Sequence, residues 1–147
     1  MIRLIKIDEL DILKNDPVRP HIEKLDVGKQ VYVLDDLSAV ICTCFCNDIP
    51  TTEEELEQFK DINGNILIAY TVWSSAKGAG RKIVIALRDL VLKNESIDRL
   101  VTMSPKTEMA KKFHLSNGAF WLRASKETDN YEYNLHRNKN ITLSHYL

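Results

Sequence analysis

The pattern of apolar and polar residues predicts short strands that alternate with amphipathic helices. The strongest strand covers 66–73 and is apolar on both faces, as in the centre of a sheet covered on both sides. A helix is predicted over 81–94, where apolar residues recur at helical spacing: Ile83, Ala86, Leu87, Leu90 and Val91. Shorter runs predict further strands over 30–34, 39–47, 99–103, 119–123 and 131–135.

Capping residues indicate two more helices. Thr52 precedes the acidic stretch 53–59 and favours a helix start there. Ser104 suits the N-cap of a later helix, with Pro105 in its first position, and the Asn-Gly pair at 117–118 suits a left-handed end. We expect that helix to turn three apolar residues inward: Met109, Ala110 and Phe113.

The two ends of the chain are less clearly patterned. Residues 2–14 fit either a strand or a short helix, and Pro17 and Pro20 break whatever precedes them. Residues 21–25 fit one turn of helix, and the tail from His136 is polar.

The order of the elements predicts one α/β (α+β) domain over 1–147. Strand–loop–helix–strand units join parallel strands through a right-handed crossover. We therefore expect a mixed sheet with helices on both faces. The chain has no repeat, low-complexity run or linker that would divide it.

Composition narrows the classes of partner. The net charge of -1 and the pI near 6.4 argue against a broad surface for nucleic acid, so any basic site must be local. The first residues alternate apolar and charged side chains, unlike a signal peptide, and no stretch is long enough to span a bilayer. We expect a cytoplasmic protein.

The three cysteines fall within one predicted strand. Cys42, Cys44 and Cys46 alternate, which puts all three on one face. Their odd number, in a chain without an export signal, favours reduced thiols. Their spacing is not a usual zinc pattern, so we expect them to pack under a helix and predict no metal site.

A glycine-containing loop joins the strong strand to the helix after it. Gly78 and Gly80 let backbone N–H groups converge at the positive end of the helix dipole, and Lys77, Arg81 and Lys82 add positive charge. This geometry favours a phosphate, although a lone G-x-G often only begins a helix. The nucleoside-triphosphate P-loop pattern is absent, and the mid-chain loop lacks the third glycine of a dinucleotide fingerprint.

Two segments resemble the core of the GNAT (GCN5-related N-acetyltransferase) superfamily. The signature of that superfamily is a strand, then [RQ]-x-x-G-x-[GA], then a helix. The segment 75–80 matches its glycines, with Ser75 in place of the usual Arg or Gln. The segment 110–119 is similar to the later A-x-x-[LF]-Y-x-x-x-G-[FA] pattern, with His114 in place of Tyr. Across most of its length the chain also resembles a GNAT-like group from phages and bacteria, which implies no particular substrate.

The resemblance implies a GNAT-type sheet, mostly antiparallel, with one splayed parallel strand pair. It implies acyl transfer from acetyl-CoA to an amine by direct attack. The pantetheine arm of coenzyme A would enter the gap between the splayed strands and pair with the first of them. The N–H of Val72 would polarise the thioester carbonyl, and the backbone of 77–82 would hold the pyrophosphate.

The resemblance also implies roles for individual residues. His114 would protonate the leaving thiolate, because the ordinary pKa of histidine lies nearer neutrality than that of a thiol. The alternative for His114 is a boundary histidine that bonds to backbone. Thr107 is a further cofactor contact, whereas capping alone explains Ser104. The implied cofactor-binding residues are Tyr70, Thr71, Val72, Trp73, Lys77, Gly78, Ala79, Gly80, Arg81, Lys82 and Thr107.

Some candidates rest on weaker signals. Asp48 or Glu53 could act as a general base, from their place at the edge of the sheet. Trp73 could line the acyl pocket because it adjoins the loop. We nevertheless expect the large aromatic residues, Trp73 included, to be mainly core residues: Tyr70, Trp73, Phe113 and Trp121.

Three functions stay open. The first is an acyl-CoA-dependent N-acyltransferase. The second is a GNAT-fold protein that has lost turnover and binds a host or partner protein, which Ser75 and the missing tyrosine favour. The third is another acyl-CoA reaction, such as decarboxylation of malonyl-CoA. The acceptor could be a protein amine, a polyamine, an aminoglycoside-like amine or a tRNA, because a fold does not fix a substrate.

Overall fold

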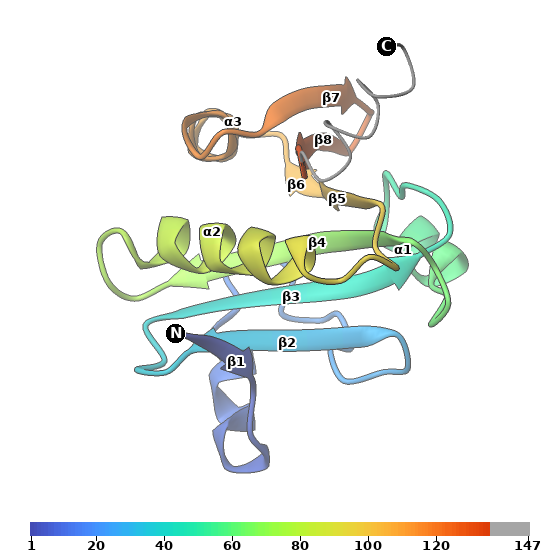
Figure 1. Cartoon of the computed structure of the whole chain (residues 1–147). Helices are drawn as coiled ribbons and strands as arrows, with labels where there is room; N and C mark the ends of the chain where they lie inside the picture. Colours follow the sequence, from blue (N-terminus) through green and yellow to red (C-terminus); the bar gives the residue numbers. More distant parts are fainter. Residues whose placement is uncertain (136–147) are drawn as a thin grey trace, which may run out of the picture.

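One mixed sheet organises residues 1–135, the part of the chain that the computed structural model describes (Figure 1). The strand order is β1-β2-β3-β4-β5-β8-β6, and β7 pairs with the free side of β8. The polar tail from His136 lies outside the described residues. The strands are β1 (Ile2–Leu4), β2 (Lys29–Leu34), β3 (Ala39–Cys46), β4 (Ile66–Ser74), β5 (Arg99–Thr102), β6 (Ser104–Pro105), β7 (Phe120–Ala124) and β8 (Thr128–Tyr133).

The parallel pair β4–β5 separates partway along its length. The two strands pair from Ile66 opposite Arg99 to Ala69 opposite Thr102. β4 then continues to Ser74, whereas the chain after β5 turns into β6, which pairs with β8 instead. Beyond Ala69, β4 therefore has β3 on one side and no strand among residues 1–135 on the other. The mixed sheet and its splayed pair confirm the predicted architecture.

A β-bulge lies at the point where the two strands separate. Opposite β4, Cys42 pairs with Thr71 and Thr43 pairs with Ala69, which leaves Tyr70 as the extra residue. A bulge bends its strand and increases the local twist. The bulge therefore turns β4 at the residue where β5 no longer accompanies it.

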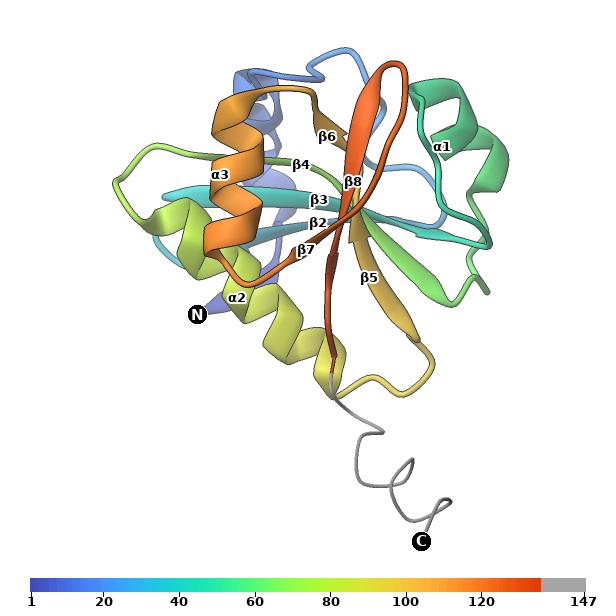
Figure 2. The same cartoon turned by 90° about the horizontal axis from the view of Figure 1, so that it is seen from above.

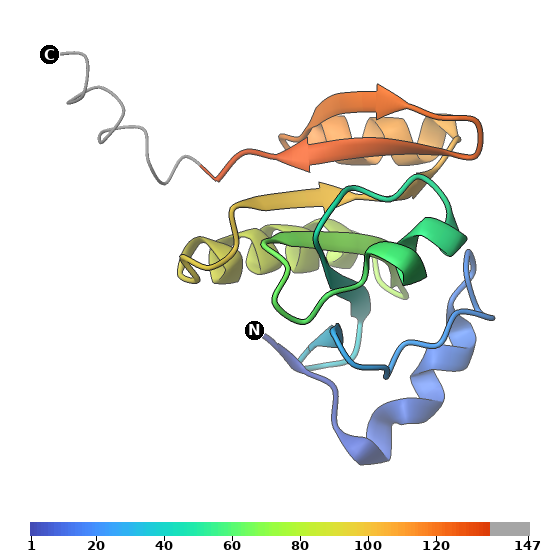
Figure 3. The same cartoon turned by 90° about the vertical axis from the view of Figure 1, so that its right-hand side faces the viewer.

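Helices cover both faces of the sheet. The crossover helix α2 (Ala79–Leu92) packs on one face of the sheet (Figure 2). Its residues Ile83 and Leu87 belong to the same buried core cluster as Leu67 and Leu100. The short helix α1 (Glu53–Phe59) covers the opposite face (Figure 3). A 3₁₀ helix (Ile7–Asn15) packs Ile12 and Leu13 against the same core cluster as α1. The last helix, α3 (Glu108–Ser116), lies beside the β7–β8 hairpin.

The cysteines pack as predicted. Cys42, Cys44 and Cys46 are free, fully buried and part of the core cluster that contains Leu56 of α1. None of the helices in residues 1–135 combines the length and apolarity that a membrane crossing requires.

The start of α3 differs from the prediction. Ser104 and Pro105 form β6, and Thr107 is the N-cap, with its Oγ1 accepting the N–H of Ala110 at 3.1 Å. The Ser104 hydroxyl instead lies 2.7 Å from that of Thr102. Pairing with β8, a distant segment, outweighs the local capping preference of a Ser-Pro pair.

The predicted burial of two side chains and the predicted helical turn at 21–25 are also wrong. Met109 is 83% exposed and Trp121 is 54% exposed, because α3 and β7 lie at the edge of the fold. The segment 21–25 forms turns rather than a helix, and Lys24 within it is buried against Asp16 at 3.1 Å. The first residues contain both of the alternatives for 2–14, a strand followed by a 3₁₀ helix.

Core packing on β4 yields a stability prediction. Ile68 is fully buried, so Ile68→Ala should lower the free energy of unfolding by about 2–5 kcal/mol through lost transfer and a residual cavity. Ile7 is 90% exposed, and Ile7→Ala should change that free energy by less than about 0.5 kcal/mol. Urea denaturation of both variants measures the difference, and equal losses would contradict the described core.

Candidate functional site

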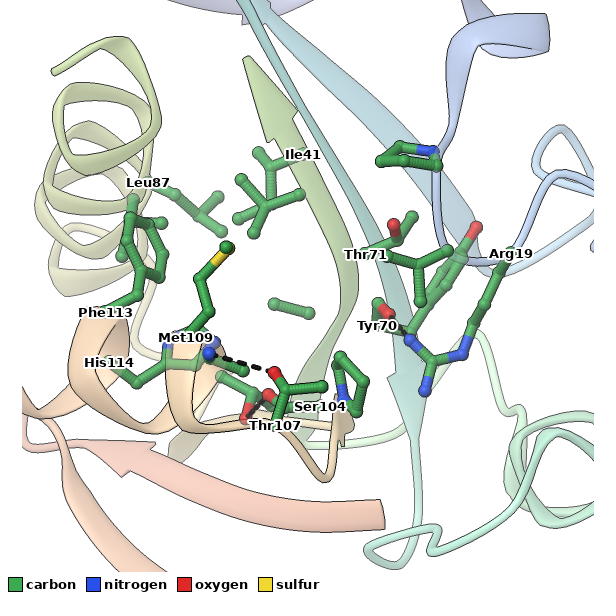
Figure 4. Close-up of a pocket in the computed structure, with 18 of the residues that line it drawn as sticks. Arg19, Ile41, Tyr70, Thr71, Leu87, Ser104, Thr107, Met109, Phe113 and His114 are labelled. Carbon is green, nitrogen blue, oxygen red and sulfur yellow. Dashed lines mark hydrogen bonds between the residues drawn. The ribbon is translucent and has the colours of Figure 1, made fainter. Parts of the chain in front are cut away.

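A cavity of about 600 Å³ opens where β4 leaves β5. Its apolar wall comes from the strands and from α2, and α3 forms a second wall. Figure 4 shows Met109, Phe113 and His114 on one side of this space and Thr71 and Arg19 on the other. The residues that line it include Arg19, Tyr70, Thr71, Val72, Ser104, Thr107, Phe113, His114 and Tyr133.

The cavity reaches both faces of the sheet. The segment Pro17–Val18–Arg19 lines it, and this segment follows the 3₁₀ helix that packs on the α1 face. Val84 and Leu87 also line it, and they belong to α2 on the opposite face. A space bounded by elements of both faces must pass between β4 and β5. Two reactants could therefore approach each other from opposite sides of the sheet.

A cluster of buried charges holds the N-terminal wall against β4. Asp16 Oδ1 accepts hydrogen bonds from the Thr71 hydroxyl and from the Arg19 backbone N–H, both at 3.0 Å. Asp16 also pairs with Lys24. Burial acts to raise the pKa of Asp16, but the N–H groups of Arg19 and Val18 and the Lys24 ammonium hold it below its usual value. The carboxylate therefore stays ionised and keeps the segment in position.

Arg19 reaches the backbone of the bulge. Its Nη1 donates to the carbonyl oxygen of Tyr70 at 2.5 Å, and its Nε lies 3.5 Å from a carboxylate oxygen of Glu53. Burial lowers the pKa of Arg19, and the charges of Glu53 and Asp16 oppose that effect. Arg19 thus satisfies a carbonyl at the bulge, where the regular pairing of β4 with β3 is interrupted.

His114 is the most buried residue of α3. Its Nδ1 lies 2.8 Å from the Tyr133 hydroxyl, and its ring stacks on Tyr131 with a centroid distance of 5.1 Å. Burial lowers the pKa of His114 to about 4. The imidazole is therefore neutral at pH 7, not near its midpoint as the sequence-based role assumed. Its partner is a tyrosine side chain rather than the backbone.

The glycine loop ends in a left-handed N-cap. Gly78 has φ of 81°, and its carbonyl accepts the first helical bond, from Lys82 N–H at 3.1 Å. The N–H of Ala79 donates to Ala76, while those of Gly80 and Arg81 have no backbone acceptor within residues 1–135. These are free donors of a helix N-terminus, at its positive end. They are available to an anion.

The first turn of α2 lies next to the cavity. A side-chain carbon at Gly80 would sit 3.4 Å from the Phe113 ring, and Phe113 lines the cavity. Arg81, however, directs its guanidinium away from the loop. It donates to the Ser116 carbonyl at 2.8 Å and to Asn117 Oδ1 at 3.1 Å. Positive charge for an anion at the loop must come from Lys77 and Lys82, both exposed.

The structure brings some of the predicted site residues together. Tyr70, Thr71, Val72, Thr107 and His114 all line the cavity. The loop residues from Lys77 to Lys82 do not line it and lie at the start of α2.

Three other candidates lie outside the cavity wall. Trp73 packs against the core cluster on the α1 face. Asp48 and Glu53 do not line the cavity either, although Glu53 contacts both Arg19 and His21, the latter at 2.7 Å.

Sequence reasoning missed Asp16, Arg19 and Tyr133. The available signal for a rigid segment was a pair of prolines, Pro17 and Pro20, each directly preceded by a charged residue. Tyr133 carried no local signal, because its partner is 19 residues away.

Solved structures with the same fold were found by comparison. No protein-family model matches the sequence, and no curated protein matches it. The GphF GNAT-like decarboxylase in complex with isobutyryl-CoA is 13% identical, with a TM-score of 0.72 over 92% of this chain and 99% of that one. Tetrahymena GCN5 is 14% identical, with a TM-score of 0.61 over 93% and 97%. AtaTR bound with acetyl-CoA is 14% identical, with a TM-score of 0.60 over 99% and 97%.

Burial of His114 yields a prediction for pH dependence. The unfolded chain, with the ordinary pKa of 6.5, binds a proton more readily than the folded chain, whose pKa is about 4. Protonation of His114 in the unfolded chain therefore lowers the stability of the fold: the full stability is present above pH 6.5 and is progressively lost as the pH falls toward 4. The loss amounts to about 3 kcal/mol, at roughly 1.4 kcal/mol for each pH unit. The free energy of unfolding, measured by urea denaturation between pH 7 and pH 4, should therefore fall more steeply with decreasing pH for the wild type than for His114→Gln. Equal slopes for the two proteins would contradict this prediction.

Proposed function

The chain has the fold of the GNAT superfamily, and on that premise we propose that it is an acyl-CoA-dependent N-acyltransferase that uses acetyl-CoA. The observation that carries the proposal is the cavity at the split of β4 and β5, which begins beside the free amides of α2. A ligand with a diphosphate at one end and a thioester at the other suits this arrangement. Structural neighbours bound to acetyl-CoA and to isobutyryl-CoA support the same class of ligand.

Each part of the cofactor has residues that suit it. The N–H groups of Gly80 and Arg81 would receive the diphosphate, with Lys77 and Lys82 beside it. The pantetheine arm would lie along β4, in the place that a paired strand would otherwise occupy. Val72, which lines the cavity past the bulge, would offer its N–H to the thioester oxygen.

The reaction needs no covalent enzyme intermediate. The acceptor nitrogen, reaching the cavity from the side of Arg19, attacks the thioester carbon and forms a C–N bond. The C–S bond breaks, and one proton passes in total from nitrogen to sulfur. A neutral His114 suits the donation of a hydrogen bond to the oxyanion or to the leaving sulfur better than it suits the transfer of a proton at pH 7.

Decarboxylation of a malonyl-type CoA is a second candidate, favoured by the same neutral histidine. Loss of carbon dioxide leaves its electron pair on the thioester as an enolate, which then takes a proton at carbon. A neutral imidazole kept uncharged by its surroundings can stabilise such an oxyanion. The neighbour with a TM-score of 0.72 is itself a GNAT-like decarboxylase.

Charge reversal near the first turn of α2 tests the cofactor assignment. Lys77→Glu with Lys82→Glu should weaken coenzyme A binding by about 10-fold or more, equivalent to about 1.4 kcal/mol, through repulsion of the diphosphate. Lys93→Glu, at the other end of the same helix, should leave binding unchanged. Isothermal titration calorimetry measures both. Failure of the wild type to bind coenzyme A would refute the proposal.

Product analysis separates the two reactions. Acyltransfer predicts release of free thiol from acetyl-CoA only when an amine is added. Decarboxylation predicts carbon dioxide from malonyl-CoA with no amine present. Thiol release from acetyl-CoA across a panel of peptides, polyamines and aminoglycosides, with a parallel carbon dioxide assay, decides between them.

A further inference from the structure

Arg19 supplies the charge of the cavity (Figure 4). Of the described residues that line this space, it alone is charged at pH 7. No aspartate, glutamate or lysine is among them, and the lowered pKa of His114 keeps that ring neutral. An arginine retains its charge even when it is buried. Apart from these two residues, the wall is apolar or carries hydroxyl groups, so the cavity has a positive character.

The Arg19 guanidinium is buried but not fully bonded. The residue is only 5% exposed. Its Nη1 donates to the Tyr70 carbonyl, and its Nε lies 3.5 Å from Glu53 without a hydrogen bond to it. Its Nη2 has no hydrogen-bond partner among residues 1–135, and those residues do not enclose it. Because Arg19 borders the cavity, a bound molecule can reach the two N–H donors of Nη2 from there.

The carboxylates near Arg19 leave this nitrogen unpaired. Glu53 does not line the cavity, its side chain is 42% exposed, and its other oxygen lies 2.7 Å from His21 Nε2. Asp16 pairs with Lys24 and accepts the backbone N–H of Arg19, not its side chain. Both carboxylates act on the charge of Arg19 from nearby, but neither is hydrogen-bonded to Nη2.

The other polar groups of the cavity are already engaged. The phenol oxygen of Tyr70 has no partner, but it is enclosed and out of reach of a ligand. The remaining hydroxyl groups that line the cavity have partners within the protein: those of Thr71, Thr102, Ser104, Thr107 and Tyr133. Arg19 Nη2 is therefore the charged donor that the protein itself leaves unused in this space.

A carboxylate is the group that suits such a donor. Hydrogen bonds between a guanidinium and a carboxylate are charge-assisted, and their strength increases in apolar surroundings where water is scarce. An ammonium group in the same place would be repelled. Polyamines and aminoglycosides carry several positive charges, so they suit this cavity poorly as acceptors. An amino acid, by contrast, carries a carboxylate next to its amine.

We propose that Arg19 Nη2 binds a carboxylate of the substrate, and that this contact selects substrates that carry one. The acceptor is the favoured source, because Arg19 belongs to the N-terminal segment on the face of the sheet opposite α2, whereas the cofactor would approach from the first turn of α2. The acyl group is the other source, because a dicarboxylic acyl group such as malonyl ends in a carboxylate. This inference rests on the proposed function and narrows its substrates.

Paired acceptors test the first source. An amino acid and its carboxamide differ in the carboxylate, and thiol release from acetyl-CoA is measured for a panel of such pairs. We expect kcat/KM to be at least about 10-fold higher for the acid, which is the size of one charge-assisted hydrogen bond. In Arg19→Gln this difference should disappear. Arg3→Gln, on the outermost strand β1 and away from the cavity, should keep it.

Paired acyl-CoA compounds test the second source. Malonyl-CoA and butyryl-CoA have acyl chains of similar length, but only the malonyl chain ends in a carboxylate. If the acyl group supplies the carboxylate, isothermal titration calorimetry should show malonyl-CoA binding to the wild type at least about 10-fold more tightly than butyryl-CoA. Arg19→Gln should bind the two about equally, and Arg3→Gln should behave as the wild type does.

A titration of the free protein requires neither coenzyme A nor turnover. The Nε–H of Arg19 gives a ¹H–¹⁵N NMR signal, which Arg19→Gln identifies by its loss. Free malonate should shift this signal in a saturable way, whereas malonamide, its uncharged analogue, should not. If the wild type binds no coenzyme A, the proposed function fails and this titration decides whether Arg19 is a carboxylate site.

The decisive outcomes come from the wild type, so they do not depend on how well the variants fold. If the wild type binds acyl-CoA but favours the acid in neither set of pairs, the proposal is overturned while the proposed function stands. A preference for the acid that survives in Arg19→Gln would also overturn it, because another group would then bind the carboxylate. A preference that Arg19→Gln loses and Arg3→Gln keeps supports it, and the set of pairs in which it occurs identifies the source.

Discussion

The separation of β5 from β4 after Ala69 is the constraint on which the site depends. A strand edge that opens inside a protein leaves backbone groups that must find partners, because unpaired buried groups are costly. The bulge in β4 adds a further carbonyl, that of Tyr70, and Arg19 donates to it. On the other side the gap stays open as a cavity. A ligand with its own amides, such as pantetheine, would complete the edge as a paired strand does.

The buried charges around Arg19 follow from the same constraint. Removing Asp16 and Lys24 from water costs several kcal/mol for each ion unless pairing and hydrogen bonds offset it. Here Asp16 meets Lys24 and accepts three hydrogen bonds, one of them from Thr71 of β4. An apolar segment could be buried at a lower free-energy cost. It could not, however, donate a hydrogen bond to the Tyr70 carbonyl or hold the cavity wall against β4 through hydrogen bonds. The charges therefore position the segment, and stability alone would not require them.

Local sequence patterns were sufficient for the scaffold and insufficient for the site. The strand at 66–73, the cysteine face and α2 were predictable because each depends on residues close in sequence. Ser104 was misassigned because pairing with β8 decides its conformation. Arg19 and Tyr133 were missed because their partners lie 51 and 19 residues away. The lowered pKa of His114 could not be predicted from the sequence for the same reason, because it results from burial by elements that are distant in sequence.

The position of Arg81 also bears on Ser75, where the chain departs from the signature it resembles. A nearby arginine could have replaced the missing Arg or Gln at the anion site, and Arg81 is the candidate by sequence distance. Its guanidinium is instead held by the Ser116 carbonyl and by Asn117. Anion binding at this loop therefore depends on backbone amides and on the exposed lysines at 77 and 82. The guanidinium of Arg81 is used inside the protein, where it joins the first turn of α2 to the end of α3.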